Sequence, residues 1–258
     1  MKNEFIDFMS QIAGDAGKEL LDYFRKDQGL ISMRSTAKEA ATGYDLIIDK
    51  FLIGEIRRRY PGHSLLTEES GRFKGDPEML WVIDSLDGTG NFANQNPLFS
   101  VCIALLRKGI PDAGVVYAPA IGELYSASRG EGARLNGKRI SVSDVEDLRE
   151  SYSLYCEGGD TDRERTGGIL TGVYREVKDI RKLGTAGLET AWVASGRSET
   201  YFTTRIDPWD VAPGVILVKE AGGRVSDFYG KEWECKRSDL LFSNSTVHSR
   251  MLEVLKQN

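Results

Sequence analysis

The stretch WVIDSLDGTGNF at residues 81–92 decides the fold and points to one site. The apolar run that ends in it, residues 79–83, predicts a buried strand that leads to the edge of a sheet. Asp84 and Asp87 follow three residues apart, and carboxylate oxygens of this kind suit Mg²⁺ or Mn²⁺. The turn at residues 88–91 offers backbone N–H groups to an anion such as phosphate if a helix starts there. The alternative is a polar turn closed by an Asx cap.

Two further segments end in carboxylates. LLTEES at residues 65–70 is an apolar run that reaches Glu68 and Glu69, and IDPWDVA at residues 206–212 contains Asp210. Several like charges are tolerated together mainly around cations. Three strand ends or helix starts that each present carboxylates therefore predict a site for more than one metal ion.

Composition bounds the class of protein. The 258 residues fit one large domain or two intimately packed halves, and the net charge of −5 argues against a nucleic-acid partner. Three widely spaced cysteines imply no disulfide framework, and two histidines exclude a His-rich zinc site. The longest apolar stretch, residues 98–106, is too short to span a bilayer, and no signal peptide is evident. We therefore expect a cytoplasmic protein without a membrane partner.

Hydrophobic periodicity predicts an α+β first half and an α/β second half, divided near residue 145. Apolar residues from Phe5 to Phe24 recur at helical spacing, a second helix is expected at about residues 44–59, and residues 99–142 are rich in strands. Asn136-Gly137 is a hairpin signal. The first half, 1–145, carries most candidate ligands, and the second, 146–258, carries Asp210. Helices are expected in the second half at residues 163–174, 185–195, 208–221 and 245–256.

Four motifs occur along the chain in a fixed order. They are Glu68-Glu69, DSLDGT with Asn91-Phe92 at residues 84–92, Gly184-Thr185-Ala186, and WDVAPG with EAGG at residues 209–223. Together they resemble the inositol monophosphatase family of Mg²⁺-dependent, lithium-sensitive phosphatases, within the group that includes archaeal-type fructose-1,6-bisphosphatases. The resemblance covers most of the chain. Two departures stand out: the family usually has proline where Ser85 lies, and Thr203 takes the place of an acidic residue that contacts inositol in inositol-specific members.

The resemblance implies an αβαβα sandwich of two closely packed halves, with the site in the cleft between them, and a homodimer. It also implies two or three Mg²⁺ ions, for which Mn²⁺ could substitute. One ion would be held by Glu68, Asp84 and the carbonyl of Leu86. A second would be held by Asp84, Asp87 and Asp210, and a third by Glu68 with waters.

Roles in substrate binding follow from the same resemblance. Asp87 and the N–H groups of Gly88 and Thr89 would bind the phosphate ester. The Thr89 hydroxyl would orient the attacking water with Asp45 behind it; alternatively, Asp45 is only a charge near the start of the second helix. The remaining expected substrate-binding residues are Gly184, Thr185 and Ala186, which equally suit a helix cap, together with Thr203 and Arg205, which would border the pocket.

These expectations define a metal-dependent phosphoric monoester hydrolase that acts on a small sugar or polyol phosphate, such as inositol monophosphate or fructose 1,6-bisphosphate. Metal-activated water would attack phosphorus directly, without a phosphoenzyme. Arg205 and Lys182 could attract a second phosphate or remain solvated. The alternatives are a nucleotide 3′-phosphatase or histidinol-phosphatase variant of the same scaffold, or a catalytically weak member with a binding or regulatory role.

Overall fold

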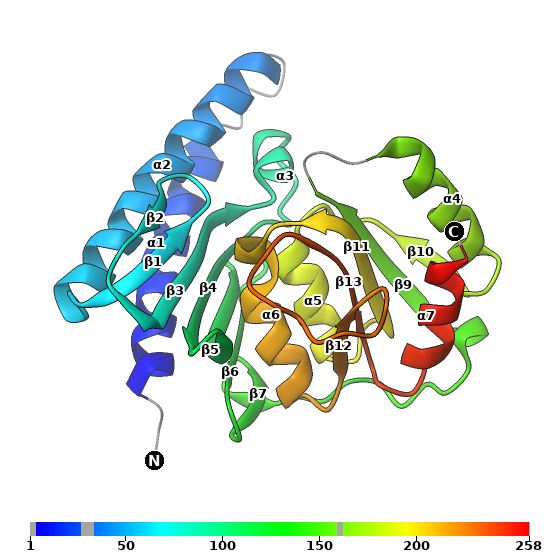
Figure 1. Cartoon of the computed structure of the whole chain (residues 1–258). Helices are drawn as coiled ribbons and strands as arrows, with labels where there is room; N and C mark the ends of the chain where they lie inside the picture. Colours follow the sequence, from blue (N-terminus) through cyan, green and yellow to red (C-terminus); the bar gives the residue numbers. More distant parts are fainter. Residues whose placement is uncertain (1–3, 27–33, 159–161, 258) are drawn as a thin grey trace.

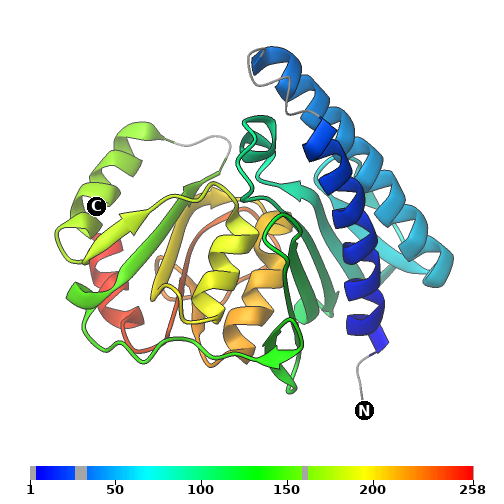
Figure 2. The same ribbon diagram turned by 180° about the vertical axis from the view of Figure 1, so that it is seen from behind.

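The computed structural model describes residues 4–26, 34–158 and 162–257, and it shows five alternating layers of helices and sheets (Figures 1 and 2). The outer helices α1 (Glu4–Lys26) and α2 (Arg34–Arg59) cover the first sheet. The central helices α5 (Ala186–Ala194) and α6 (Pro208–Glu220) lie between the two sheets. Helices α4 (Arg163–Tyr174) and α7 (His248–Lys256) cover the far face of the second sheet. The predicted αβαβα sandwich is therefore confirmed.

The first sheet has eight strands in the order β2-β1-β3-β4-β5-β6-β7-β8. Among the strand pairs of the described residues in this sheet, β1–β3 is parallel and the others are antiparallel. Along β3 the side chains alternate, so that Trp81 and Ile83 pack under α1 and α2 while Leu80 and Val82 pack toward α5 and α6. Burial on both faces explains the unbroken apolar run. The strands are β1 (His63–Thr67), β2 (Gly71–Phe73), β3 (Asp76–Asp87), β4 (Ser100–Arg107), β5 (Ile110–Ala118), β6 (Glu123–Ser128), β7 (Gly132–Leu135) and β8 (Lys138–Arg139).

Strand β3 continues beyond the predicted end at Ile83. Its pairing with β4 reaches Asp87 opposite Ser100, with an irregularity between Asp84 and Asp87. The two aspartates therefore belong to a bulged strand end rather than to a turn, and a bulge is a common means of redirecting side chains beside a site. The short helix α3 (Thr89–Ala93) follows at once.

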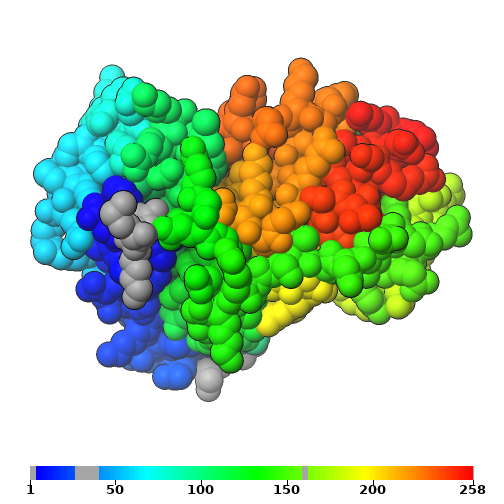
Figure 3. Space-filling model, turned by 90° about the horizontal axis from the view of Figure 1, so that it is seen from below, coloured from blue at the N-terminus to red at the C-terminus, as the bar shows by residue number. Residues whose placement is uncertain are grey.

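The second sheet has five strands in the order β10-β9-β11-β13-β12. The connection from the first sheet includes a short 3₁₀ turn, Leu148–Glu150, and crosses the face seen from below in Figure 3. The first sheet ends before residue 145 and the second begins after it. The division of the chain into two halves near residue 145 remains a prediction. The strands are β9 (Tyr152–Glu157), β10 (Asp179–Arg181), β11 (Thr200–Ile206), β12 (Arg224–Asp227) and β13 (Ser238–Ser243).

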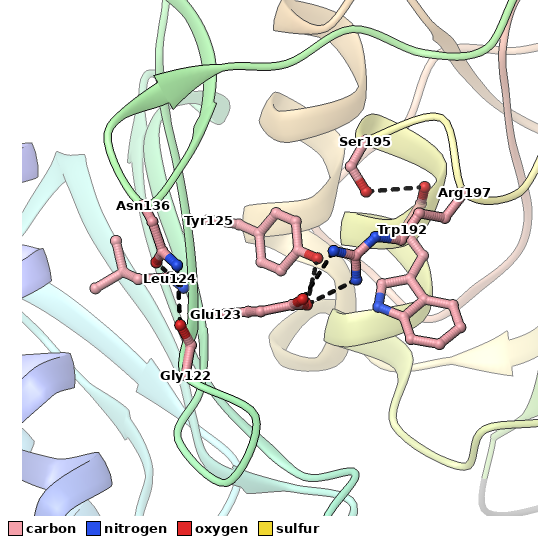
Figure 4. Close-up of polar contacts among 8 residues, drawn as sticks. All are labelled: Gly122, Glu123, Leu124, Tyr125, Asn136, Trp192, Ser195 and Arg197. Carbon is pink, nitrogen blue, oxygen red and sulfur yellow. Dashed lines mark hydrogen bonds and ion pairs between the residues drawn. The ribbon is translucent and has the colours of Figure 1, made fainter.

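The central helices pack against each other and against both sheets in one continuous core. At Gly214 of α6 an added Cβ would lie 2.1 Å from Oγ1 of Thr190 in α5, so only glycine permits this approach of the helices. Polar contacts join the halves as well. The Arg197 guanidinium, just beyond α5, donates to both carboxylate oxygens of Glu123 in β6 at 2.7 and 2.8 Å (Figure 4).

Most of the predicted helices agree with the structure. Helix α4 has the predicted bounds, and α6 ends one residue early. Helix α2 starts at Arg34, about ten residues earlier than expected, because Gly43 and its polar neighbours hide the periodicity. The hairpin between β7 and β8 is confirmed, with φ of 49° at Asn136 and 78° at Gly137. No helix in the described ranges is long and apolar enough to cross a membrane.

Candidate active site

Three carboxylates from separate elements meet between the two halves. Glu68 follows β1, Asp84 lies in β3, and Asp210 lies in the first turn of α6. One oxygen from each lies within 4.8 Å of the others. Oxygen donors without cysteine or histidine fit a hard divalent cation such as Mg²⁺ or Mn²⁺. The structure thus brings together residues that lie up to 142 positions apart in the sequence.

The electrostatics of this cluster favour a cation. Burial first, and then the charges of the neighbouring carboxylates, raise the pKa of Asp84 and of Asp210 well above its usual range. The same two causes raise the pKa of Glu68 to about 7, although its side chain is open to the cleft. Carboxylates that hold protons in the absence of a cation can release them and bind a divalent cation instead.

Asp87 lies outside this cluster, and its carboxylate joins the two halves. Oδ1 accepts the N–H of Ala186 at 2.9 Å. Oδ2 accepts the N–H of Gly187 at 2.9 Å, the hydroxyl of Ser100 at 2.7 Å and the hydroxyl of Thr185. Asp87 therefore binds the start of α5, and because Oδ1 has one partner it can still accept a metal ion.

The turn after Asp87 is shaped by Gly88, which has a φ of +89° and caps α3. A Cβ there would lie 3.1 Å from the carbonyl oxygen of Leu98, so the left-handed backbone and the tight space both require glycine. The Thr89 hydroxyl donates to the carbonyl of Leu86 at 3.1 Å. Because α3 has only five residues, any phosphate binding there depends on individual N–H groups rather than on a helix dipole.

Asp45 lies on α2 and is 2% exposed. Its partner is Ser85, whose hydroxyl donates to Oδ1 at 2.5 Å. No hydrogen bond links Asp45 to Thr89 within the described ranges, so the expected pairing of these two residues is not made directly. Burial raises the pKa of Asp45 to about 8, while the bond from Ser85 acts in the opposite direction.

A cleft of about 500 Å³ opens beside the cluster, and this is a size suited to a small ligand. Six of its lining residues are acidic and one, Arg237, is basic. Arg237 also donates to both oxygens of Asp207. An anionic ligand therefore requires cations in this cleft. The lining residues are Glu68, Glu69, Asp87, Cys156, Glu157, Gly158, Gly184, Ala186, Ile206, Asp207, Trp209, Asp210 and Arg237.

The segment before α5 forms one wall of this cleft. Gly184 and Ala186 line it, whereas the Thr185 side chain is fully buried and donates to Asp87. Asn91 holds this wall in place, because its side-chain amide donates to the carbonyls of Leu98 at 2.6 Å and Leu183 at 2.7 Å. The sequence motif includes Asn91, but the hydrogen bond from Asn91 to Leu183 could be found only from the structure.

The structure corrects the expected placement of Thr203. This side chain is fully buried and does not line the cleft. Thr203 lies two residues after Tyr201 in β11, so it points to the same face of the sheet, toward the core that contains α5 and α6. A glutamate placed there would be a buried charge rather than a substrate contact.

Arg205 and Lys182, which were expected near a second phosphate, do not line the cleft. Arg205 is exposed beyond the cleft lining, and its backbone N–H donates to Asp239 at 2.8 Å. Lys182 donates to Glu157 at 2.6 Å, so its charge is already paired at the edge of the cleft. Neither residue provides a free cation at this site.

Comparison with known proteins agrees with this geometry. The model of the inositol monophosphatase family matches residues 1–258. The chain belongs to the inositol monophosphatase family. It is 35% identical over 253 residues to a Thermotoga maritima protein named fructose-1,6-bisphosphatase/inositol-1-monophosphatase, covering 98% of this chain and 96% of that protein. It is 36% identical over 245 residues to the Nus factor SuhB of Escherichia coli K12, covering 93% and 91%.

A solved structure gives the same result for the fold. Inositol monophosphatase from Anabaena (Nostoc) sp. PCC 7120 superposes with a TM-score of 0.88 at 34% identity, covering 98% of this chain and 95% of that one. Membership of the inositol monophosphatase family supports a phosphatase. This family is generally metal-dependent, and Glu68, Asp84 and Asp210 form an acidic group that could hold a metal ion.

The raised pKa values of Asp45 and Glu68 predict how stability depends on pH. An acid whose pKa is raised by folding contributes its full stability below its unfolded pKa of about 4, and the contribution is lost as pH rises through the folded pKa. Without divalent cations, we therefore expect a lower melting temperature at about pH 8 than at about pH 5. Mg²⁺ should raise the melting temperature more at the higher pH, because it replaces fewer protons there. Thermal unfolding with Mg²⁺ or a chelator measures this, and an equal Mg²⁺ effect at both pH values would contradict it.

Proposed function

We propose that this protein is a Mg²⁺-dependent phosphomonoesterase that hydrolyses small sugar or polyol phosphates. The observation that carries the proposal is the convergence of Glu68, Asp84 and Asp210 within 4.8 Å beside a cleft of about 500 Å³. The acidic lining of the cleft would repel a phosphate ester unless bound cations neutralise it. A phosphatase is also the activity that family membership supports.

The metal-holding residues in this proposal are the three clustered carboxylates, Oδ1 of Asp87 and the carbonyl of Leu86. When bound, divalent cations supply Lewis acidity that polarises the phosphoryl oxygens and favours ionisation of water. Thr89 would orient the attacking water, with Asp45 behind it. Water adds directly to phosphorus, the ester P–O bond breaks, and the departing alkoxide takes up a proton, so no phosphoenzyme forms.

Few of the uncharged residues that line the cleft offer a side-chain donor: they are Cys156, Gly158, Gly184, Ala186, Ile206 and Trp209. A site with few directed polar contacts discriminates weakly between analogues. We therefore propose that both inositol monophosphate and fructose 1,6-bisphosphate are substrates. The name of the Thermotoga maritima relative, which covers both activities, supports this class. A homodimer remains a prediction.

A phosphate-release assay with Mg²⁺ against a panel of esters tests the proposal. We expect kcat/KM for inositol monophosphate and fructose 1,6-bisphosphate to agree within about tenfold. The panel includes a nucleoside 3′-phosphate and histidinol phosphate as the competing substrates. A preference of about a hundredfold for one of these two would show a nucleotide 3′-phosphatase or a histidinol-phosphatase instead of a sugar phosphatase. If phosphate were released from no ester in the panel, the proposed phosphatase activity would be overturned.

A further inference from the structure

Helix α2 carries two buried carboxylates one turn apart, and each accepts a hydrogen bond from a serine of the first sheet region. Ser85 donates to Oδ1 of Asp45 at 2.5 Å, and Ser70 donates to Oδ2 of Asp49. Asp45 and Asp49 are 2% and 1% exposed, and Ser85 is 1% exposed. The two bonds are similar in chemistry, but only Ser85 lies inside the site motif, in the bulge between Asp84 and Asp87.

The Ser85 hydroxyl fixes one side of the Asp45 carboxylate. Its oxygen lies 2.5 Å from Oδ1 and 3.2 Å from the backbone carbonyl oxygen of the same residue. A hydroxyl has one proton to donate, and the shorter contact to a carboxylate is the stronger one. Within the described ranges Asp45 has no second hydrogen-bond partner, so Oδ2 keeps its capacity to accept a hydrogen bond from water.

This bond depends on the hydroxyl of Ser85. Proline, which the resemblance leads us to expect at this position, has no hydroxyl and could not make it. Because Ser85 precedes Leu86, whose carbonyl accepts the Thr89 hydroxyl, the bulge connects to Asp45 on one side and to Thr89 on the other. A change in the Ser85 side chain therefore acts on Asp45 without removing a contact of Thr89.

We propose that Ser85 is a positioning residue, whose hydroxyl holds the Asp45 carboxylate so that Oδ2 alone is available to the attacking water. The inference rests on the proposed function, in which Asp45 stands behind Thr89. Removing one hydrogen bond to a charged group should lower kcat about tenfold in Ser85→Ala. KM and the Mg²⁺ concentration at half activity should stay within about twofold, because neither depends on Asp45 orientation in this account.

The experiment compares Ser85→Ala, Ser85→Thr and Ser85→Cys with the native protein, and repeats Ser85→Ala in an Asp45→Asn background. Thr keeps the hydroxyl and should restore kcat, while the weaker donor of Cys should give an intermediate value. In the Asp45→Asn background Ser85→Ala should have little further effect on kcat. The control is Ser70→Ala, which removes a serine bond to the neighbouring carboxylate Asp49; kcat should change less than twofold, and the melting temperature should fall less than in Ser85→Ala because Ser70 is exposed.

The outcomes distinguish a failure of the Ser85 positioning role from a failure of the proposed phosphatase function. Equal losses of kcat in the native and Asp45→Asn backgrounds would overturn the positioning role, as would an unchanged kcat in Ser85→Ala. Activity recovered by additional Mg²⁺ would also overturn it, because Ser85 would then act through Asp84 and Leu86. A native protein that releases no phosphate from any ester overturns the proposed function and this inference together.

Discussion

Replacing Asp210 by asparagine is expected to lower kcat by two or more orders of magnitude, about 3 kcal/mol of transition-state stabilisation. Asp210 is the only member of the acidic cluster, among the described residues, that comes from the second half of the chain. Asparagine keeps the shape of the side chain but removes the charge that a divalent cation requires. The fold should survive, because the loss of one carboxylate relieves repulsion with Glu68 and Asp87.

The control for this variant is Asp112→Asn. Asp112 lies in β5, pairs with Arg107 and Arg129, and does not line the cleft. Its replacement removes the same charge from the same kind of side chain, so kcat should remain within about twofold of the native value. Steady-state kinetics at saturating Mg²⁺ compare the two variants. A near-normal kcat for Asp210→Asn would show that Asp210 is not a metal ligand.

Removal of divalent cations is expected to abolish phosphate release, and added Mg²⁺ should restore it. The physical reason is the charge of the cleft, where six carboxylates face one guanidinium that is already paired with Asp207. Mn²⁺ should substitute, because it accepts the same oxygen ligands. The assay compares chelated protein with the same sample after each metal is added back. Undiminished turnover in metal-free buffer would rule out this mechanism.

The sequence predicted most helices, the strand β3 and the acidic segments because their signals are local, whereas the layers were expected from the family resemblance. The apolar run of β3, the helical spacing of α1 and Pro208 at the start of α6 each follow from short-range patterns. The end of β3 could not be predicted in this way, because its extension to Asp87 depends on pairing with Ser100 across the sheet.

Contacts between distant residues account for what the sequence left unpredicted in the site. The Ser85–Asp45 bond joins positions 40 apart, and the bonds from Asp87 to the start of α5 span about a hundred positions. Thr203 was misplaced for the same reason, since only the packing of the central helices against this face of β11 reveals that its side chain is enclosed. Residue type indicated which side chains carry chemistry, whereas the pairing of strands decided which of them face the cleft.

The central position of α5 and α6 has a consequence for how the chain folds. These helices are encoded after the first sheet is complete, yet they cover one of its faces. A nascent chain that ends before residue 186 would leave the apolar side of that sheet exposed to water, and such surfaces favour aggregation. The first sheet should therefore reach its final packing only after α5 and α6 are available, and contacts between distant positions should slow this step.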